Sequence, residues 1–491
     1  MTTQKAKLFG TDGIRGTVGQ FPLVPEFILS LGLATGLVMK GSTTRPTVIV
    51  GRDTRQSGQM LQTALVTGLL SAGATIIDVG VIPTPGIAYL VRKLGSQAGA
   101  VISASHNPVE QNGIKIINSD GSKLSEEIEA EIEKLATNPD SLKTAPTDSF
   151  GRCIDGSGMR ELYLDGLLIE HPDLDLTNFT IVLDCANGAA SWFAPECLSR
   201  MGAQIITIHA SPTGFNINNK SGSEHVRKHP EDLHKLIQQY SANFGIAFDG
   251  DADRVIFVDE NGNLIDGDHI LAILAGYLNR KGKLLANTIV ATSMRNQGLL
   301  EYIKAQNMKF IETQVGDKYV SEQLAMLAGK DYFSGFGLGG EQAGHIILYD
   351  QEHNTGDGIR TALYVIQALV DENSGSLSAL ASCIKKTPQV IASAYVTLKP
   401  NMESINELEQ IKFGLTKELP SLMRMELRYS GTEPLFRAML ESGYSNSEQE
   451  LANTAWKMCR AVQKSAGLNT IDANSIEILN VSRGGLLTFS N

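Results

Sequence analysis

Short apolar runs recur along the first two thirds of the chain, and each is separated from the next by a stretch long enough for a helix. Unbroken apolar runs are typical of strands that helices cover on both faces. The runs fall into three groups, and each group predicts a strand–helix–strand–helix–strand unit. The first group comprises 47–51, 74–78 and 98–103, the second 180–184, 203–208 and 244–248, and the third 288–292, 308–312 and 331–334.

Each predicted unit ends in a loop rich in glycine and polar residues. These loops begin at Ala104, Asp249 and Gly339. Since ligand groups in open α/β sheets gather beyond the strand ends, we expect the three loops to face a common site. The units lie farther apart than the roughly 20 to 50 residues of solenoid repeats, so the pattern predicts tandem domains.

The predicted pattern of helices and strands changes at about residue 372. From there on, amphipathic helical patterns (404–415 and 447–467) alternate with short strands. The predicted fold class is therefore α/β, with three tandem related α/β/α domains and a C-terminal α+β domain. The expected boundaries are 1–152, 153–258, 259–371 and 372–491, with 373–376 as the last linker. The apolar stretch 27–39 is too short to span a bilayer and predicts a buried helix.

The amino-acid composition excludes some classes of function. The 491 residues are 42% hydrophobic and 19% charged, with a formal net charge of −11, which fits a globular protein that does not bind nucleic acid. An acidic surface also repels small anions, so a phosphate site here requires a local cluster of basic residues. Five scattered cysteines without a CxxC pair, and a start in which Lys5 and Lys7 lead into no apolar segment, predict a reduced, cytoplasmic protein.

Three carboxylates at alternate positions, Asp249, Asp251 and Asp253, form the strongest candidate for a metal site. Such carboxylates repel one another unless a cation neutralises them, and their hard oxygen atoms suit Mg²⁺, Ca²⁺ or Mn²⁺. An EF-hand is excluded, because Arg254 stands where that loop requires glycine and 255–258 is strand-like. The alternative is a solvated acidic turn, which Arg254 makes less favourable since a guanidinium beside a metal commonly holds phosphate.

Ser105 follows a predicted strand and precedes His-Asn-Pro, where a serine can act as a nucleophile or phosphoryl carrier, or simply cap a helix. The hydrolase sequence GxSxG is absent from the chain, so phosphoryl transfer fits Ser105 and the acidic loop better than acyl transfer. Lys115, farther along, either adds positive charge to the same pocket or is an exposed lysine.

Two further segments are candidates for anion and sugar binding. The first is a turn flanked by arginines, and it comprises Arg428, Ser430, Gly431, Thr432 and Arg437. This set suits phosphate, with an ordinary polar turn as the alternative. In the second segment, Glu341 and His345 could hold sugar hydroxyls or move protons.

Two nucleotide-binding motifs are not supported. The run 335–340 matches GxGxxG, but a dinucleotide site requires a helix after it and 346–349 is strand-like, which argues against NAD. No Walker A sequence is present, so ATP is not indicated as a phosphoryl donor. The glycine-rich start 9–16, with Arg15 near its end, is by itself a weak candidate for an anion-binding loop.

Five segments taken in order closely resemble those of the α-D-phosphohexomutase superfamily. They are FGTDGIRG (9–16), SASHNP (103–108), DGDADR (249–254), GGEQAGH (339–345) and RYSGTEP (428–434). The match spans most of the chain, from Phe9 to Arg437. The resemblance implies four domains around a central cleft, each contributing one loop, and the loops are most similar to those of members that act on glucosamine phosphates.

The resemblance also implies a role for each candidate residue. Ser105 would carry the phosphoryl group, and one Mg²⁺ per chain would be held by phosphorylated Ser105, Asp249, Asp251 and Asp253. The transferred group would be surrounded by Arg15, Lys115 and Arg254. Glu341 would contact the sugar, and the non-reacting phosphate would be gripped by Arg428, Ser430, Gly431, Thr432 and Arg437.

The implied reaction interconverts glucosamine 6-phosphate and glucosamine 1-phosphate through a phosphoserine and a glucosamine 1,6-bisphosphate intermediate. Lys115 and His345 are both candidates for the general base. Ala343 stands where the family's sugar loop usually has serine, which removes one hydrogen bond to the sugar, and Tyr429 replaces a frequent lysine or proline.

Three other functions stay open at this point: phosphomannomutase/phosphoglucomutase activity, a metal-dependent sugar phosphatase, and a non-catalytic paralogue that binds sugar phosphates. The expected partner is a small sugar phosphate, with neither nucleic acid nor a membrane involved. A homodimer is compatible with the sequence.

Overall fold

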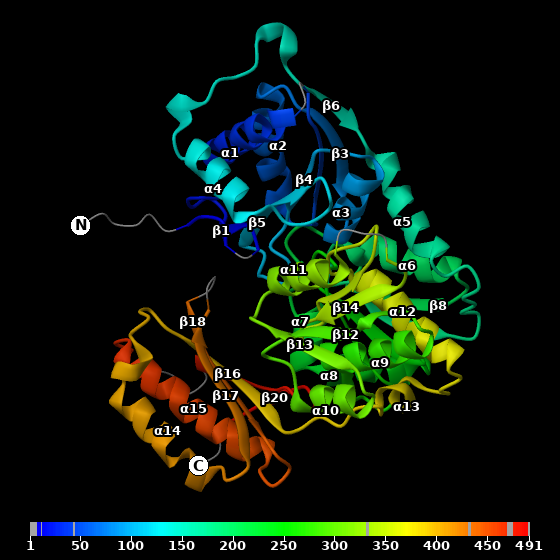
Figure 1. Ribbon diagram of the computed structural model, residues 1–491, viewed down its shortest axis with the longest axis vertical. Helices are drawn as coiled ribbons and strands as arrows, with labels where there is room; N and C mark the ends of the chain where they lie inside the picture. The colour runs from blue at the N-terminus through cyan, green and yellow to red at the C-terminus, as the bar shows by residue number, and fades with distance from the viewer. Residues whose placement is uncertain are drawn as a thin grey trace.

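Four successive α/β units make up the molecule. The computed structural model describes residues 7–10, 12–42, 45–329, 333–430, 434–468 and 475–489. Figure 1 shows the first unit, in blue and cyan, above the green and yellow middle of the molecule, and the fourth, in orange and red, at the lower left. The predicted fold class, three related α/β/α domains followed by an α+β domain, is confirmed.

The first three sheets share a core of four strands in one order. The first sheet is β1(Ile14–Thr17), β5(Gln111–Asn118), β4(Ala98–Ile102), β2(Thr47–Arg52), β3(Thr75–Val81) and β6(Arg152–Asp155). The second is β11(Leu264–Ile265), β10(Val255–Val258), β9(Phe244–Phe248), β7(Thr180–Asp184) and β8(Gln204–Ile208). The third is β13(Lys309–Thr313), β12(Leu284–Thr292), β14(Phe336–Gly340) and β15(Ile346–Tyr349). In each sheet the first strand of the repeat pairs in parallel with the second and third, and a further antiparallel strand pairs with the third.

The antiparallel strands β5, β10 and β15 give the polar loops their position. Each loop connects the third parallel strand of its unit to this antiparallel neighbour, so it turns back at the carboxyl edge of the sheet. The sequence therefore predicted the equivalence of the three loops correctly. The strands after the second and third loops were predicted from 255–258 and 346–349, while β5 after the first loop was not predicted.

One predicted strand was wrong. The third strand of the third unit was expected at 331–334, and the structure has it at β14, within the GxGxxG run. Residues 330–332 lie outside the described part of the chain. A Cβ atom on Gly339 would lie 2.7 Å from Val320 and 2.8 Å from the Val290 carbonyl oxygen, so glycine here permits close packing of a helix on the sheet. Glycines carry no hydrophobic signal, which is why the apolar pattern missed this strand.

Helices cover both faces of the first three sheets, as predicted. Those of the first unit are α1(Pro25–Met39), α2(Gln56–Ser71), α3(Thr84–Lys93) and α4(Glu126–Ala136). Those of the next two are α5(Arg160–Ile169), α6(Ala190–Arg200), α7(Gly222–Lys228), α8(Pro230–Tyr240), α9(Gly267–Arg280), α10(Gln297–Ala305), α11(Asp317–Ala328), α12(Gly358–Asp371) and α13(Leu377–Ala381). In β2, Val48 and Val50 pack toward α1 and α2, while Ile49 packs toward α3 and α5. The buried helix expected at 27–39 is α1.

The fourth unit is an antiparallel sheet with two helices on it. The sheet is β17(Leu422–Tyr429), β18(Leu435–Ser442), β16(Gln389–Tyr395), β19(Ile476–Asn480) and β20(Leu486–Leu487). The helices are α14(Asn406–Glu418) and α15(Glu448–Ser465), close to the predicted positions. Stretch 373–376 joins α12 to α13, and the domain boundaries themselves stay a prediction.

The apolar cores show how the units are joined. One continuous cluster of buried side chains extends from Ile49 to Ile384 and is shared by the first three units. The fourth unit has a separate cluster, from Val390 to Ile478. The fourth unit is therefore attached to the others through a junction outside both clusters. Among the described residues, none of the helices has both the length and the apolar character that crossing a bilayer requires.

The crossing of α1 and α2 generates a test of the fold. A Cβ atom on Gly68 would lie 2.1 Å from the Leu29 carbonyl oxygen. Gly68→Ala should therefore push the helices apart and lower the free energy of unfolding by about 1–3 kcal/mol. Denaturant unfolding measures this, with Gly41→Ala as the control, because a Cβ atom on Gly41 meets nothing within 4 Å. Equal stability of the two variants would contradict the close packing.

Candidate active site

Ser105 lies in the turn between β4 and β5 in a left-handed conformation, with φ of 52°. Its side chain is buried, and its backbone N–H donates to Ser103 Oγ at 2.9 Å. No helix follows it, so the alternative role as a helix cap is wrong. A left-handed serine is unfavourable by itself, which means that the surrounding contacts hold it there.

A buried arginine that the sequence analysis missed fixes this turn. Arg55, which follows β2, is fully buried, and its Nε donates to Asp53 Oδ2 at 2.9 Å. Its other nitrogens donate to backbone carbonyl oxygens of Ser105, Asn107, Pro108 and Gln111. The signal was available, because Asp53-Thr54-Arg55 directly follows a predicted strand at the sheet edge where ligand loops gather.

A second missed residue reaches the turn from the second unit. Asn218 Nδ2 donates to the Ser105 carbonyl oxygen at 2.8 Å and to the Asn107 carbonyl oxygen at 3.1 Å. The Ser105 carbonyl oxygen is thus held from both sides, by Arg55 and by Asn218. Nothing in the local sequence around Asn218 indicates this contact, since the two segments lie far apart in the chain.

The acidic loop lies directly against Ser105. The Ser105 hydroxyl donates to Asp249 Oδ2 at 2.6 Å. Ligand oxygens of Asp249, Asp251 and Asp253 lie within 4.8 Å of one another, and all three side chains are buried, which excludes the solvated turn. Burial raises the pKa of Asp249 well above its ordinary value, and the carboxylates of Asp253 and Asp251 raise it further.

The three carboxylates fit a divalent cation. Oδ1 of Asp251 and Oδ1 of Asp253 are buried and have no hydrogen-bond partner. Buried oxygens in this condition are costly unless something neutralises them. Clustered carboxylate oxygens are the ligands that Mg²⁺ prefers in proteins.

Lys115 is a buried cation at the same place, and not an exposed lysine. Its Nζ lies 3.2 Å from Asp251 Oδ2 and 3.5 Å from Asp253 Oδ2, and 3.4 Å from Asp12 Oδ1. Burial alone would lower the pKa of Lys115, but these carboxylates hold it above its ordinary value. The side chain therefore supplies positive charge beside Ser105 in this arrangement.

Two guanidinium groups add unsatisfied donors. Arg15 Nη1 donates to Asn107 Oδ1 at 3.4 Å and Arg15 also pairs with Asp12, while its Nε is buried without a partner. Arg254 Nε is likewise buried without a hydrogen bond, 3.9 Å from Asp253 Oδ1. Such N–H groups are suited to phosphate oxygens, so both predicted residues are available for an anion.

The loop of residues 341–345, called the sugar loop after its predicted role, brings Glu341 and His345 to the same region. Glu341 Oε1 accepts a hydrogen bond from the Gly316 backbone N–H at 3.0 Å. His345 is buried, with Nδ1 3.6 Å from Asp253 Oδ1 and Nε2 3.7 Å from Asp317 Oδ2. Burial by itself lowers the pKa of His345, but the carboxylates around it, Asp253 first, raise it to about 9. The imidazole is therefore charged at neutral pH in this arrangement.

A cavity of about 190 Å³ adjoins these residues. Its lining includes Lys115 on β5 and Asp253 of the acidic loop, together with Lys123 and Asp317. Lys123 Nζ bridges the first and third units, at 3.1 Å from Asp12 Oδ1 and 2.7 Å from an Asp317 carboxylate oxygen. Lys123 and Asp317 were not predicted, because only the packing of the two units brings them together.

The fourth loop is only partly within the described residues. Arg428 on β17 lies directly opposite Arg437 on β18, so the two predicted guanidinium groups come from neighbouring strands. Ser430 is buried, and Gly431 and Thr432 lie outside the described part of the chain. Tyr429 has a structural role here, since its hydroxyl donates to the Pro400 carbonyl oxygen at 2.8 Å.

Comparison with known proteins agrees with this geometry. Three models of the phosphoglucomutase/phosphomannomutase family, its alpha/beta/alpha domains I, II and III, match residues 6–143, 162–262 and 266–387. Phosphoglucosamine mutase of Geobacter metallireducens is 42% identical over 94% of this chain and 99% of its own. That of Geobacillus thermodenitrificans is 43% identical over 89% and 94%, respectively.

Solved structures share the fold. A phosphoglucomutase/phosphomannomutase family protein of Burkholderia thailandensis superposes with a TM-score of 0.71 at 23% identity, covering 95% of this chain and 98% of that one. N-acetylphosphoglucosamine mutase of Aspergillus fumigatus, in complex with GlcNAc-6P and magnesium, gives 0.62 at 17% identity, covering 94% and 96%.

The acidic loop yields a test of metal binding. Asp251→Asn removes one of three charges that a cation neutralises, so Mg²⁺ should raise the melting temperature less than in the unaltered protein. Thermal melts with and without Mg²⁺ measure the difference. Asp165→Asn is the charge-matched control, since that side chain is 62% exposed and outside the loop. A Mg²⁺-induced shift as large in Asp251→Asn as in the control would exclude the metal site.

Proposed function

The chain belongs to the phosphoglucomutase/phosphomannomutase family, and on that premise we propose that it interconverts glucosamine 6-phosphate and glucosamine 1-phosphate. The observation that carries this proposal is the buried Ser105 hydroxyl, 2.6 Å from a carboxylate of the acidic triad and beside two arginines with unsatisfied N–H groups. The choice of sugar is supported by the relatives named phosphoglucosamine mutase.

Ser105 carries the phosphoryl group in the proposed mechanism. The free hydroxyl of the sugar phosphate attacks phosphorus, the bond from phosphorus to Ser105 Oγ breaks, and a general base takes the hydroxyl proton. The product is glucosamine 1,6-bisphosphate. It turns end for end and returns its other phosphoryl group to Ser105, which restores the phosphoserine and releases the isomeric monophosphate.

The residues around Ser105 stabilise the charge of the transferred group. Asp249, Asp251 and Asp253 would hold one Mg²⁺, which supplies neutralisation of phosphate charge when bound. Arg15 and Arg254 offer N–H groups to the phosphate oxygens. Because these groups are buried and held in place before the substrate arrives, they need little reorganisation during transfer.

The general base is one of two residues, Lys115 or His345. The carboxylates beside each residue favour its charged form. Either residue must therefore lose a proton before it can accept the one from the sugar hydroxyl. Binding of a cation to Asp251 and Asp253 would weaken the attraction of these carboxylates for a proton on either residue. The base would therefore lose its proton more readily when the metal is bound.

The distal phosphate is held by the fourth unit in this proposal. Arg428 and Arg437 lie opposite each other on β17 and β18 and present two guanidinium groups on one ladder. A substrate that reacts at either end needs a second site that grips whichever phosphate is not reacting. In this proposal, that requirement accounts for a pair of arginines on a unit separate from the metal loop.

The carrier role of Ser105 is tested by Ser105→Ala. Turnover should fall to background while the melting temperature stays near that of the unaltered protein. Intact-mass analysis of the unaltered protein should show a phosphorylated fraction located at Ser105. Ser141→Ala, at an exposed position, should keep full activity. Measurable mutase activity in Ser105→Ala would remove the carrier from the mechanism.

Sugar choice is tested by comparing glucosamine 6-phosphate with glucose 6-phosphate. A carboxylate at Glu341 pairs with a protonated 2-amino group and gives no such advantage to a 2-hydroxyl. We therefore expect a higher kcat/KM for glucosamine 6-phosphate, and Glu341→Gln should reduce the ratio about tenfold, the effect of one charged hydrogen bond.

The control for sugar choice is Glu301→Gln, which neutralises an exposed carboxylate on α10 and should leave the ratio unchanged. If the unaltered protein prefers glucose or mannose phosphate, that sugar takes the place of glucosamine in the proposal, and the phosphoserine mechanism is unaffected. Release of free phosphate in place of sugar 1-phosphate would indicate a phosphatase.

A further inference from the structure

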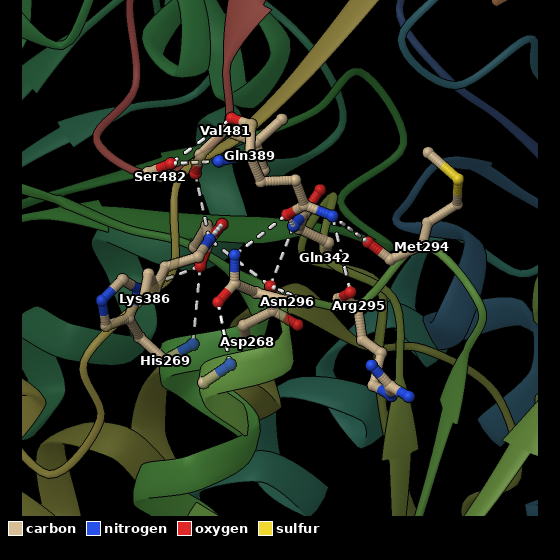
Figure 2. A network of polar contacts seen from close by, with 12 residues as sticks. Asp268, His269, Met294, Arg295, Asn296, Gln342, Lys386, Gln389, Val481 and Ser482 are labelled. Atoms are coloured by element: carbon tan, nitrogen blue, oxygen red, sulfur yellow. Dashed lines mark hydrogen bonds and ion pairs between the residues drawn. The ribbon is translucent and has the colours of Figure 1, made fainter. Parts of the chain in front are cut away.

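A buried polar network joins the third unit to the fourth, and Figure 2 shows it at close range. The network takes side chains from the start of α9, the segment before α10, the sugar loop, the segment before β16, the first residue of β16 and the C-terminal segment. These side chains are Asp268, Asn296, Gln342, Lys386, Gln389 and Ser482. Because the apolar core of the fourth unit is separate, these contacts contribute directly to the orientation of that unit.

Gln342 occupies the centre of the network. Its Nε2 donates to Asp268 Oδ2 and to Gln389 Oε1, both at 2.9 Å. Its side chain is 4% exposed, and it directly follows Glu341. The sugar loop is thus tied through one amide group to a residue of the third unit and to the first strand of the fourth.

Gln389 is held in a single orientation. Its Oε1 also accepts from Asn296 Nδ2 at 3.1 Å, while its Nε2 points at the carbonyl oxygens of Met294 and Arg295. Its backbone N–H donates to Ser482 Oγ at 2.7 Å. With carbonyl oxygens on one side of the amide, the oxygen must face Gln342, which requires Gln342 to donate.

The sheet of the fourth unit extends this connection to the phosphate-binding arginines. Gln389 on β16 pairs with Glu441 on β18, and the same ladder pairs Ser393 with Arg437. Arg437 in turn lies opposite Arg428 on β17. Strand pairs in a sheet keep their relative positions, so the placement of Gln389 fixes the direction in which both arginines are presented.

We propose that Gln342 is a positioning residue that couples the sugar loop to the phosphate-binding arginines of the fourth unit. The amide keeps Glu341 and the Arg428–Arg437 pair in one geometry, so that the sugar and its distal phosphate are recognised together. This inference rests on the proposed function, in which Glu341 binds the 2-amino group of the sugar and the arginines hold the non-reacting phosphate.

The test uses Gln342→Met, which has a similar length and no amide, and Gln342→Asn, which keeps the amide and shortens its reach. Each should lower kcat/KM about tenfold, chiefly through KM, and narrow the preference between glucosamine and glucose 6-phosphates. The phosphorylated fraction of Ser105 should not change. If Gln342→Met fails to fold, Gln342→Asn carries the test, because it leaves a polar group beside Asp268.

A double-mutant cycle separates coupling from loss of stability. If Gln342 and Gln389 act as one link, adding Gln389→Met to Gln342→Met should lower kcat/KM no further. Tyr277→Phe is the control, since it removes a hydrogen bond to Asp371 that lies outside the network. It should lower the melting temperature and leave the sugar preference unchanged.

Three results would overturn the proposal: a kcat/KM within twofold of the unaltered protein in both Gln342 variants, losses that multiply in the double variant, or the same loss of sugar preference in Tyr277→Phe. Failure of the proposed function is a separate outcome. If another hexose phosphate is the better substrate, that sugar replaces glucosamine in the cycle, and the cycle still decides whether Gln342 couples the two sites.

Discussion

Mutual repulsion among three buried carboxylates is the constraint on which the rest of the site depends. Asp249, Asp251 and Asp253 cannot remain ionised together in a buried loop without compensating charge. The compensation comes from another unit, since Lys115 lies on β5. Thr84, from the first unit as well, donates through Oγ1 to Asp251 Oδ2 at 2.6 Å. The carboxylate charges that favour cation binding therefore also attract Lys115, and this attraction holds the first unit against the second.

The molecule combines two kinds of junction. The first three units share one apolar core, which fixes Ser105, the acidic loop and the sugar loop relative to one another. The fourth unit meets the third through buried polar groups, among them Lys386, which pairs with Asp266 and donates to the Val481 carbonyl oxygen at 3.0 Å. Directional contacts define an orientation more narrowly than apolar packing does, so a unit that only holds a phosphate is still placed accurately.

The apolar pattern was sufficient to predict the repeated units and the common position of their loops, because strands and helices differ in hydrophobic period. It failed where side chains carry no such signal, as in the glycine strand β14. Arg55 was missed although its position directly after a predicted strand was a signal, and Asn218 was missed because its contact joins segments far apart in the chain. The local sequence shows which chemical group a residue carries. Which residues it contacts depends on the packing of the folded chain.

The left-handed backbone at Ser105 restricts which amino acid can stand there. A threonine also has a hydroxyl, but its branched Cβ makes a positive φ strongly unfavourable. Arg55 and Asn218 hold the carbonyl group of this residue in place, so the turn cannot relax to accommodate the branch. The preference for a primary alcohol over a secondary one at this position is thus set by main-chain stereochemistry, before any difference in the reactivity of the two alcohols is considered.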